Sequence, residues 1–199
     1  GDEYYGLGHN GNIVNAQSLR GELEDRGSIF QSTMDSEVIV HLMAQHLKRG
    51  LEKALSIALQ QVEGAYSLVM LTRDKIIAAR DPRGFRPLAL GKLNNSWVVA
   101  SETCAFDLVG AEYVRDVEPG EILIIDAGGV KSLKPFPVMK HCHCIFELIY
   151  FARPDSSIFG QNVYLCRKRL GHEMAREYHP DIDLVMPFPD SGNYAALGF

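Results

Sequence analysis

Apolar residues recur at helical spacing in the first third of the chain. One set precedes Gly50 and consists of Ile39, Leu42, Met43 and Leu47. A second set precedes Gly64 and consists of Leu51, Leu55, Ala58, Leu59 and Val62. This spacing places the apolar side chains on one face and predicts two helices. Ser32 or Thr33 is suited to cap the first helix, which would put Asp35 in its first turn, where the helix dipole favours a carboxylate.

Between residues 65 and 133 the pattern changes to short runs typical of strands. The runs cover residues 65–72, 75–80, 87–91, 96–101, 121–125 and 130–133. Turn-forming pairs such as Asn94-Asn95 and Pro119-Gly120 separate them. Helices followed by an antiparallel meander predict a layered α+β domain.

The composition shifts at Lys134-Pro135-Phe136-Pro137, and we place a domain boundary between residues 138 and 139. Beyond it, residues 144–151 form an apolar run that looks buried. A helix is predicted from Asn162 to a stop at Pro180, with one apolar face made of Val163, Cys166, Leu170 and Met174. Residues 182–188 predict an apolar strand, 189–193 a polar turn, and Tyr194 the start of a helix. This order is typical of an α/β unit with a parallel sheet.

Gly8-His9-Asn10-Gly11-Asn12 is the polar stretch with the clearest chemical meaning. An Asn-Gly pair is most often a hairpin turn. Such a turn also frees a backbone N–H, and the Asn amide beside it is a second donor. Asn10 and Gly11 could therefore face one oxygen, as an oxyanion hole requires. An ionised Asp35 could hold a substrate ammonium.

Composition narrows the classes of protein. The chain has 199 residues, a net charge of −5, 46% hydrophobic residues and 23% charged residues, which is ordinary for a soluble globular protein. The acidic balance argues against a nucleic-acid partner. The one basic run, Arg167-Lys168-Arg169, is short and predicts a solvated helix face. No apolar run reaches the roughly 18 residues of a membrane span, so we expect no membrane partner.

Four cysteines do not make a disulfide scaffold and favour a reducing, cytoplasmic compartment. His141-Cys142-His143-Cys144 contains zinc-binding residue types. Successive side chains of an extended segment point to opposite faces, which would place the two histidines and the two cysteines on different faces, so the spacing is poor for zinc. The chain starts at Gly1 without a methionine and stops at Phe199 inside a predicted helix, and we expect an internal fragment of a longer protein.

His9-Asn10-Gly11-Asn12 followed by Asp35-Ser36-Glu37 resembles the glutaminase domain of class II glutamine amidotransferases, which are N-terminal-nucleophile hydrolases. Residues 80–88 and 100–103 resemble further segments of that domain. The resemblance implies a four-layer αββα sandwich over residues 1–138, with its N-terminal part missing. It implies that Asn10 and Gly11 form the oxyanion hole and that Asp35 binds the amino group of glutamine.

Residues 144–156 and Pro189-Asp190-Ser191-Gly192 narrow the resemblance to the amidophosphoribosyltransferases. Residues 139–199 would then begin a type I phosphoribosyltransferase domain, truncated at Phe199. The resemblance places Asp190 and Gly192 in a pyrophosphate loop and makes Ser191 a ligand of Mg²⁺. It implies that glutamine, phosphoribosyl pyrophosphate and water give 5-phosphoribosylamine, glutamate and pyrophosphate, the first committed step of purine synthesis. It also implies a homo-oligomer, in the cytoplasm or in a plant plastid.

In one branch of this family, a cysteine at the position of Cys144 is one of four ligands of a [4Fe–4S] cluster. The three partners of Cys144 would lie beyond Phe199. The family's nucleophile is an N-terminal cysteine, where this chain has Gly1, so we expect the fragment itself to be inactive. Two alternatives stay open: another class II amidotransferase, such as a hexosamine-forming enzyme, or a non-catalytic zinc-binding module.

Overall fold

The computed structural model describes residues 4–199, which form two compact units. The first contains the chain up to Arg86 together with Val117–Cys142. The second contains Pro87–Asp116 and His143–Phe199. The predicted boundary between residues 138 and 139 stays a prediction.

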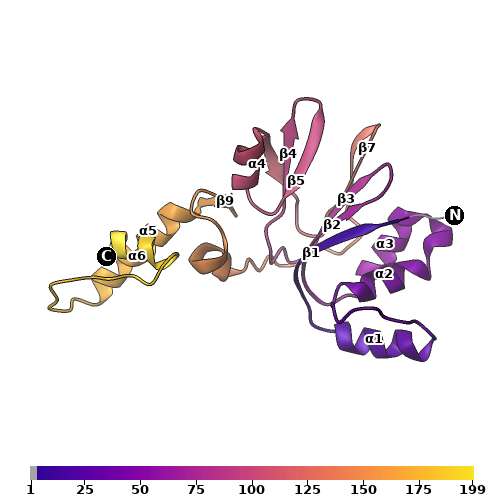
Figure 1. Cartoon of the computed structure of the whole chain (residues 1–199), viewed down its shortest axis with the longest axis horizontal. Helices are drawn as coiled ribbons and strands as arrows, with labels where there is room; N and C mark the ends of the chain where they lie inside the picture. Colours follow the sequence, from indigo (N-terminus) through magenta and orange to yellow (C-terminus); the bar gives the residue numbers. More distant parts are fainter. Residues whose placement is uncertain (1–3) are drawn as a thin grey trace. The chain divides into compact units, whose positions relative to one another are not determined.

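A five-stranded antiparallel sheet is the framework of the first unit. Its order is β1 (Gly6–Ile13), β2 (Gly64–Leu71), β3 (Ile76–Arg80), β7 (Ile122–Asp126) and β8 (Gly129–Leu133). Four of these strands confirm predicted runs to within a residue or two at their ends. β1 was not predicted, because its glycines interrupt the alternation that marks a strand. It lies beside β2 (Figure 1).

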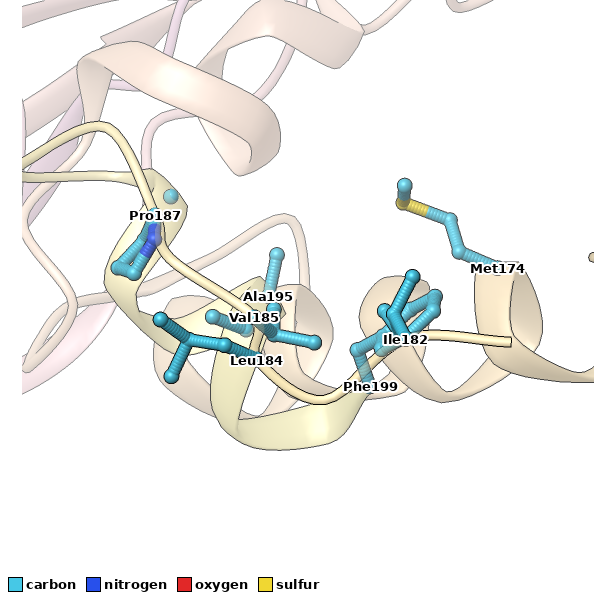
Figure 2. Close-up of a pocket in the computed structure, with 9 residues that line it drawn as sticks. Met174, Ile182, Leu184, Val185, Pro187, Ala195 and Phe199 are labelled. Carbon is cyan, nitrogen blue, oxygen red and sulfur yellow. The ribbon is translucent and has the colours of Figure 1, made fainter. Parts of the chain in front are cut away.

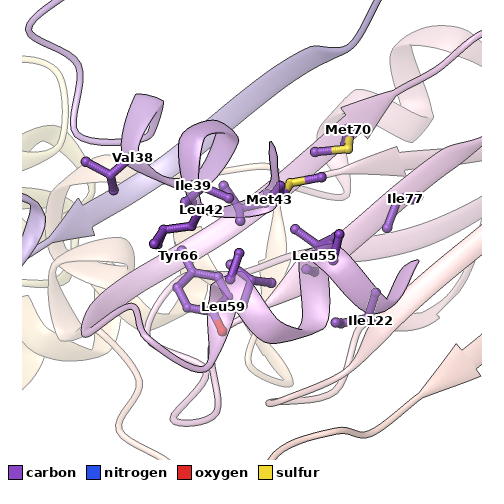
Figure 3. Close-up of a cluster of buried hydrophobic side chains, with 14 of the residues drawn as sticks. Val38, Ile39, Leu42, Met43, Leu55, Leu59, Tyr66, Met70, Ile77 and Ile122 are labelled. Carbon is purple, nitrogen blue, oxygen red and sulfur yellow. The ribbon is translucent and has the colours of Figure 1, made fainter. Parts of the chain in front are cut away.

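Three α-helices belong to the first unit: α1 (Ala16–Asp25), α2 (Glu37–Ala44) and α3 (Leu51–Leu59). A 3₁₀ turn at Leu47–Arg49 separates α2 from α3. Buried side chains of α2 and α3, such as Ile39 and Leu55, pack on strand residues such as Met70 (Figure 3). Full burial of such a side chain stabilises the fold by roughly 1.5–3 kcal/mol.

The first predicted helix starts later than its sequence suggested. Ser32 does not cap it, because the Ser32 N–H and hydroxyl both donate to the carboxylate of Glu37. Asp35 therefore lies in the loop before α2 rather than in its first turn. The helix also ends early, at Ala44, and α3 ends at Leu59, before the predicted stop at Gly64.

The second unit contains a three-stranded antiparallel sheet in the order β5 (Ser96–Ala100), β4 (Ala89–Leu93), β6 (Glu112–Asp116). The short helix α4 (Cys104–Val109) packs on this sheet through Phe106, which is buried with Ala89 and Ala111. β4 and β5 confirm the predicted runs, whereas β6 was not predicted.

The rest of the second unit contains a π-helical turn (Glu147–Phe151), a small hairpin of β9 (Ser157–Ile158) and β10 (Gln161–Asn162), and helices α5 (Val163–Glu177) and α6 (Gly192–Gly198). α5 confirms the helix predicted from Asn162, and the Asn162 side chain caps it by accepting a hydrogen bond of 3.0 Å from the Leu165 N–H. α5 and α6 touch closely: a Cβ at Gly171 would overlap the carbonyl group of Ala195.

Three predictions for this unit were wrong. Residues 182–188 form no strand, because a strand needs a hydrogen-bonded neighbour and none of the described residues supplies one. In the run 144–151 only Glu147 and Leu148 are buried, while its five large apolar neighbours are exposed. Arg167 is 3% exposed rather than solvated, because its guanidinium donates to the carbonyl oxygens of Leu148 at 2.9 Å and Ala152 at 2.8 Å.

Candidate functional site

Asn10 and Gly11 lie within β1 and not in the turn that the Asn-Gly pair predicted. They face Ser67 and Tyr66 across the β1–β2 pair. Gly11 has a φ of 156°, and a Cβ at this position would overlap the carbonyl oxygen of Ala65 and approach His9 Nε2 to 2.8 Å. The backbone geometry at this point therefore requires glycine.

The Gly11 N–H points away from β2. In an antiparallel pair, successive N–H groups point to opposite edges of the strand. The Val14 N–H donates to Glu63 on the β2 side, whereas the Ile13 N–H donates to the Asp35 carboxylate on the other side. The same alternation directs the Gly11 N–H to the edge that carries Asp35. Asn10 directly precedes Gly11 and is exposed, so its side-chain amide and the Gly11 N–H are donors on adjacent residues of β1.

The Asp35 carboxylate is fixed against β1 by both of its oxygens. Oδ2 accepts a hydrogen bond of 2.8 Å from the Ile13 N–H, and Oδ1 lies 3.3 Å from Nδ1 of His9. The other ring nitrogen of His9 lies 3.4 Å from the carbonyl oxygen of Ala65. The His9 side chain is 5% exposed, whereas Asp35 remains 30% exposed. Asp35 is thus held in place and still accessible to a ligand.

His9 is a residue to which the sequence assigned no role. Its two ring nitrogens both face oxygen acceptors, so it links the Asp35 carboxylate to β2. His9 directly precedes Asn10 and Gly11 in the sequence, and this position could have suggested that its side chain supports the site.

Residues 80–86 form a turn in which Arg80 and Asp81 are buried, whereas Arg83 is exposed. Arg80 is 2% exposed, and its guanidinium donates to three carbonyl oxygens: Arg86 at 2.8 Å, Val117 at 2.7 Å and Gly84 at 3.1 Å. Asp81 is fully buried and accepts hydrogen bonds from the backbone N–H groups of Arg83 and Phe85. Burial raises the pKa of the Asp81 carboxyl. These contacts give the segment a structural role.

Two other segments that carried the resemblance are joined through Glu102. Its carboxylate accepts hydrogen bonds from the Arg153 N–H at 2.8 Å and from the buried Ser156 hydroxyl at 2.7 Å. The hydroxyl of Thr103 accepts a hydrogen bond of 2.8 Å from the Ser157 N–H. These contacts connect the end of β5 to the loop before β9.

Asp190, Ser191 and Gly192 form the turn that leads into α6. The Asn193 N–H donates to the Asp190 carbonyl oxygen at 3.2 Å, and the Ser191 hydroxyl makes no capping hydrogen bond. Within residues 4–199, no hydrogen bond or ion pair of the Asp190 carboxylate or the Ser191 hydroxyl is formed. The polar groups of this turn are therefore available to a ligand.

An apolar pocket of about 370 Å³ lies beside this turn (Figure 2). Its lining includes Met174, Ile182, Leu184, Val185 and Phe199. Side chains of this kind offer no donor or acceptor to orient a polar substrate. The pocket is therefore not the candidate site.

The cysteines do not assemble a metal centre by themselves. In the described part of the chain, no group of three or more His, Cys, Asp or Glu side chains is arranged to hold a metal ion. His143 instead stacks on Phe159, with ring centroids 4.1 Å apart, and Cys104 and Cys166 are buried. Gly1, with which the chain begins where the family has its N-terminal cysteine, lies outside the described residues. None of the helices in residues 4–199 is both long and apolar enough to cross a membrane.

Comparison with known proteins defines the class first. Residues 1–107 match the family model of the glutamine amidotransferase domain, which covers more than half of the chain. The chain therefore belongs to the glutamine amidotransferase domain family.

The particular relatives are amidophosphoribosyltransferases. The chloroplastic amidophosphoribosyltransferase 2 of Arabidopsis thaliana is 49% identical over 98% of this chain and 35% of its own length. The amidophosphoribosyltransferase of Bacillus subtilis is 46% identical over 97% of this chain and 40% of its own length. The chain thus spans about a third to two fifths of these relatives, and the predicted resemblance is confirmed.

Solved structures agree with this assignment. The allosteric regulatory enzyme of purine biosynthesis matches 99% of this chain and 42% of its own, with a TM-score of 0.95 and 45% identity. Glutamine phosphoribosylpyrophosphate amidotransferase from B. subtilis, in complex with ADP and GMP, matches 98% of this chain and 43% of its own, with a TM-score of 0.94 and 46% identity. The predicted fold class, an N-terminal-nucleophile hydrolase fold followed by the start of a phosphoribosyltransferase domain, is confirmed by these matches. The matches extend well beyond residue 107, so neither the hexosamine-forming enzyme nor the zinc module is favoured.

Proposed function

We propose that the whole protein containing this chain is an amidophosphoribosyltransferase. It would convert glutamine, phosphoribosyl pyrophosphate and water into 5-phosphoribosylamine, glutamate and pyrophosphate. The observation that carries the proposal is the accessible Asp35 carboxylate, held on β1 beside Gly11, in a chain that matches amidophosphoribosyltransferases over nearly all of its residues.

The glutamine site would use the outer edge of β1. Asp35 would bind the α-ammonium of glutamine, because its carboxylate is fixed yet partly exposed. The Asn10 amide and the Gly11 N–H would donate to the oxyanion that forms when the side-chain amide is attacked. One donor of this kind typically contributes about 10²- to 10³-fold to the rate.

The turn before α6 would bind the pyrophosphate group of the second substrate. Asp190 and Gly192 belong to this turn, and Ser191 offers a hydroxyl that forms no capping bond. Mg²⁺ prefers oxygen ligands and usually binds through one or two protein groups together with substrate phosphates. One free hydroxyl fits that requirement. Bound Mg²⁺ would neutralise phosphate charge, and Ser191 would position it.

The residues of this chain do not fit an iron–sulfur cluster on their own. A [4Fe–4S] cluster needs four thiolates, and Cys144 has no second or third ligand beside it in the described residues. A role for Cys144 in such a cluster remains the earlier expectation, and the proposed reaction does not depend on it.

The proposed partners are glutamine and phosphoribosyl pyrophosphate, in a homo-oligomer. The proposed location is the cytoplasm, or a plastid if the source is a plant, since several relatives are chloroplastic proteins.

The test is pyrophosphate release by the whole protein, with glutamine or with ammonia as the nitrogen donor. Asp35→Ala should abolish the glutamine-dependent rate and spare the ammonia-dependent one, whereas Ser191→Ala should lower both. Absence of pyrophosphate release under both conditions would refute the transferase. Equal loss of both rates in Asp35→Ala would refute the glutamine site.

A further inference from the structure

The loop between α1 and α2 carries Asp35, and apolar packing does little to hold it. Ile29 is 82% exposed and Met34 is 60% exposed, so two of its large apolar side chains point to solvent. Phe30 is the apolar residue of this loop that packs against the core. The position of the Asp35 backbone must therefore depend on polar contacts to the loop.

Glu37 supplies one set of these contacts from the first turn of α2. Its carboxylate accepts hydrogen bonds from the Gln31 N–H at 2.8 Å, the Ser32 N–H at 2.9 Å and the Ser32 hydroxyl at 2.6 Å. The Ser32 hydroxyl in turn accepts a hydrogen bond of 3.2 Å from the Met34 N–H. The backbone is thus fixed at three points just before Asp35.

Arg20 supplies the second set from α1. Its guanidinium donates to the carbonyl oxygens of Ser32 at 2.8 Å and Met34 at 3.4 Å, and lies 4.0 Å above the Phe30 ring. The same group lies 3.9 Å from the Glu37 carboxylate. Arg20 therefore binds the carbonyl side of the loop and Glu37 the N–H side.

The geometry points to Arg20 and Glu37 as positioning residues for glutamine binding. This inference rests on the proposed function, because it assigns them to the site that Asp35 would form. They touch neither Asp35 nor the Asn10–Gly11 edge in any contact described above. They fix the four residues before Asp35, and so keep its carboxylate against Ile13 and His9. Loss of either would displace the ammonium site and leave the oxyanion donors in place.

The experiment compares variants of the whole protein. Arg20→Met removes the donors and keeps much of the side-chain length over Phe30. Arg20→Lys keeps the charge but not the planar fork. Arg26→Met is the matched control. Arg26 lies directly after α1, its side chain is 64% exposed, and its guanidinium lies 3.8 Å from the Glu22 carboxylate. The readouts are KM and kcat for glutamine, the ammonia-dependent rate and the thermal midpoint.

Arg20→Met should raise the KM for glutamine about tenfold or more, since small displacements of a binding group cause losses of this order. Its ammonia-dependent rate should stay within about twofold of the parent's. Arg20→Lys should give a KM for glutamine between that of the parent and that of Arg20→Met. Arg26→Met should have the KM of the parent. An unchanged KM in folded Arg20→Met, or an equal fall of both rates, would overturn the inference.

A second variant covers the case in which Arg20→Met does not fold. Glu37→Gln leaves Arg20 in place and replaces one accepting oxygen by a donor that faces a backbone N–H. It should raise the KM for glutamine in the same direction, and an unchanged KM in the folded protein would overturn the inference. Asp35→Ala separates failure of the proposed glutamine site from failure of the positioning role. If Asp35→Ala keeps the glutamine-dependent rate of the parent, the proposed glutamine site itself is wrong. If Asp35→Ala loses that rate while Arg20→Met and Glu37→Gln keep the KM of the parent, only the positioning role is wrong.

Discussion

The two candidate binding regions differ in how their polar groups are held. In the first region, β1 and the loop before α2, the Asp35 carboxylate has a partner on each oxygen. The second region consists of residues 182–192 before α6, where the Ser191 hydroxyl makes no capping hydrogen bond. The apolar residues of this region are exposed to solvent, with Leu184 79% exposed and Phe188 92% exposed.

The difference shows what a positioned site requires. An exposed carboxylate binds a cation well only if other contacts already hold it in position. Otherwise the loss of conformational entropy on binding weakens the affinity. The first region has such contacts within the described residues. Among residues 4–199 no strand pairs with the apolar residues 182–188, so no neighbouring strand within this range fixes the turn as one fixes a phosphate loop in a parallel sheet.

The largest effect is expected at Gly11, where the first region depends on backbone geometry. Gly11→Ala would place a methyl group on the Ala65 carbonyl oxygen and against His9, and would move the Gly11 N–H. The glutamine-dependent kcat should fall about 10²- to 10³-fold, with the ammonia-dependent rate preserved. Steady-state kinetics with each nitrogen donor measures this.

Gly8→Ala is the control for this prediction. Gly8 lies in the same strand, and an added Cβ would lie 3.8 Å from the Val69 carbonyl oxygen, an ordinary contact. If Gly8→Ala and Gly11→Ala reduce the glutamine-dependent rate equally, the proposed use of the Gly11 N–H fails.

His9 is expected to give the next largest effect. His9→Ala removes a partner of a charged carboxylate, a contact worth about 1.5–3 kcal/mol, so the KM for glutamine should rise about 10- to 100-fold. His9→Asn can place a donor where Nδ1 stands, facing Asp35, whereas His9→Gln can place one where Nε2 stands, facing Ala65. Partial recovery in His9→Asn but not in His9→Gln would identify the Asp35 contact as the important one. The reverse order would assign the effect to the β2 contact.

In the second region the corresponding prediction concerns packing. Gly171→Ala would drive a methyl group into the Ala195 carbonyl and separate α5 from α6. The free energy of unfolding should fall by about 1–2 kcal/mol, the lower part of the range for overpacked sites, because a short helix can shift. Gly21→Ala is the opposite control, since a Cβ there meets nothing within 4 Å, and it should stabilise α1 by about 0.5–1 kcal/mol. Urea unfolding of both variants measures the difference. Equal shifts in both variants would contradict the close contact.

The first region also shows which features of the site could be predicted from the sequence. The Asn10-Gly11 pair and Asp35 were identified from short motifs, because their residue types carry the chemistry. The strand that holds them was not, since glycines conceal the alternation of β1. The contacts of Arg20 were invisible for another reason: they join residues 12 and 14 positions apart through backbone oxygens, which leave no pattern in the side chains.

Burial in the second unit was harder to predict than secondary structure. The capped helix at Asn162 follows a local rule and was found. Arg167 looked like part of a solvated basic run, yet it is buried because it binds the carbonyl oxygens of the preceding π-helical turn and of the residue after it. Residues 182–188 have the composition of a strand, but composition cannot supply the neighbouring strand that would complete the hydrogen bonding.

The smallest expected effect is a pH dependence that belongs to the first region alone. Hydrogen bonds to the Glu37 carboxylate, chiefly from the Gln31 N–H and then from the Ser32 hydroxyl, lower the pKa of Glu37 from 4.5 to about 2. A carboxyl with a lowered pKa in the folded state stabilises the fold above its unfolded pKa. This contribution should be complete above about pH 5 and should disappear as the pH falls from 4.5 towards 2.

Thermal midpoints of the parent and Glu37→Gln between pH 7 and pH 3 test this directly. Glu37→Gln should melt lower at pH 7, by a modest amount because the side chain is still 18% exposed, and the two midpoints should converge as the pH falls below 4.5. Glu22→Gln, on the exposed surface of α1, controls for the loss of a surface carboxylate and should shift the midpoint less at pH 7. A midpoint difference for Glu37→Gln that stays constant down to pH 3 would show that the charge of Glu37 does not hold the loop. The first region would then be fixed by Arg20 and Phe30, and the contrast with the turn before α6 would rest on fewer contacts.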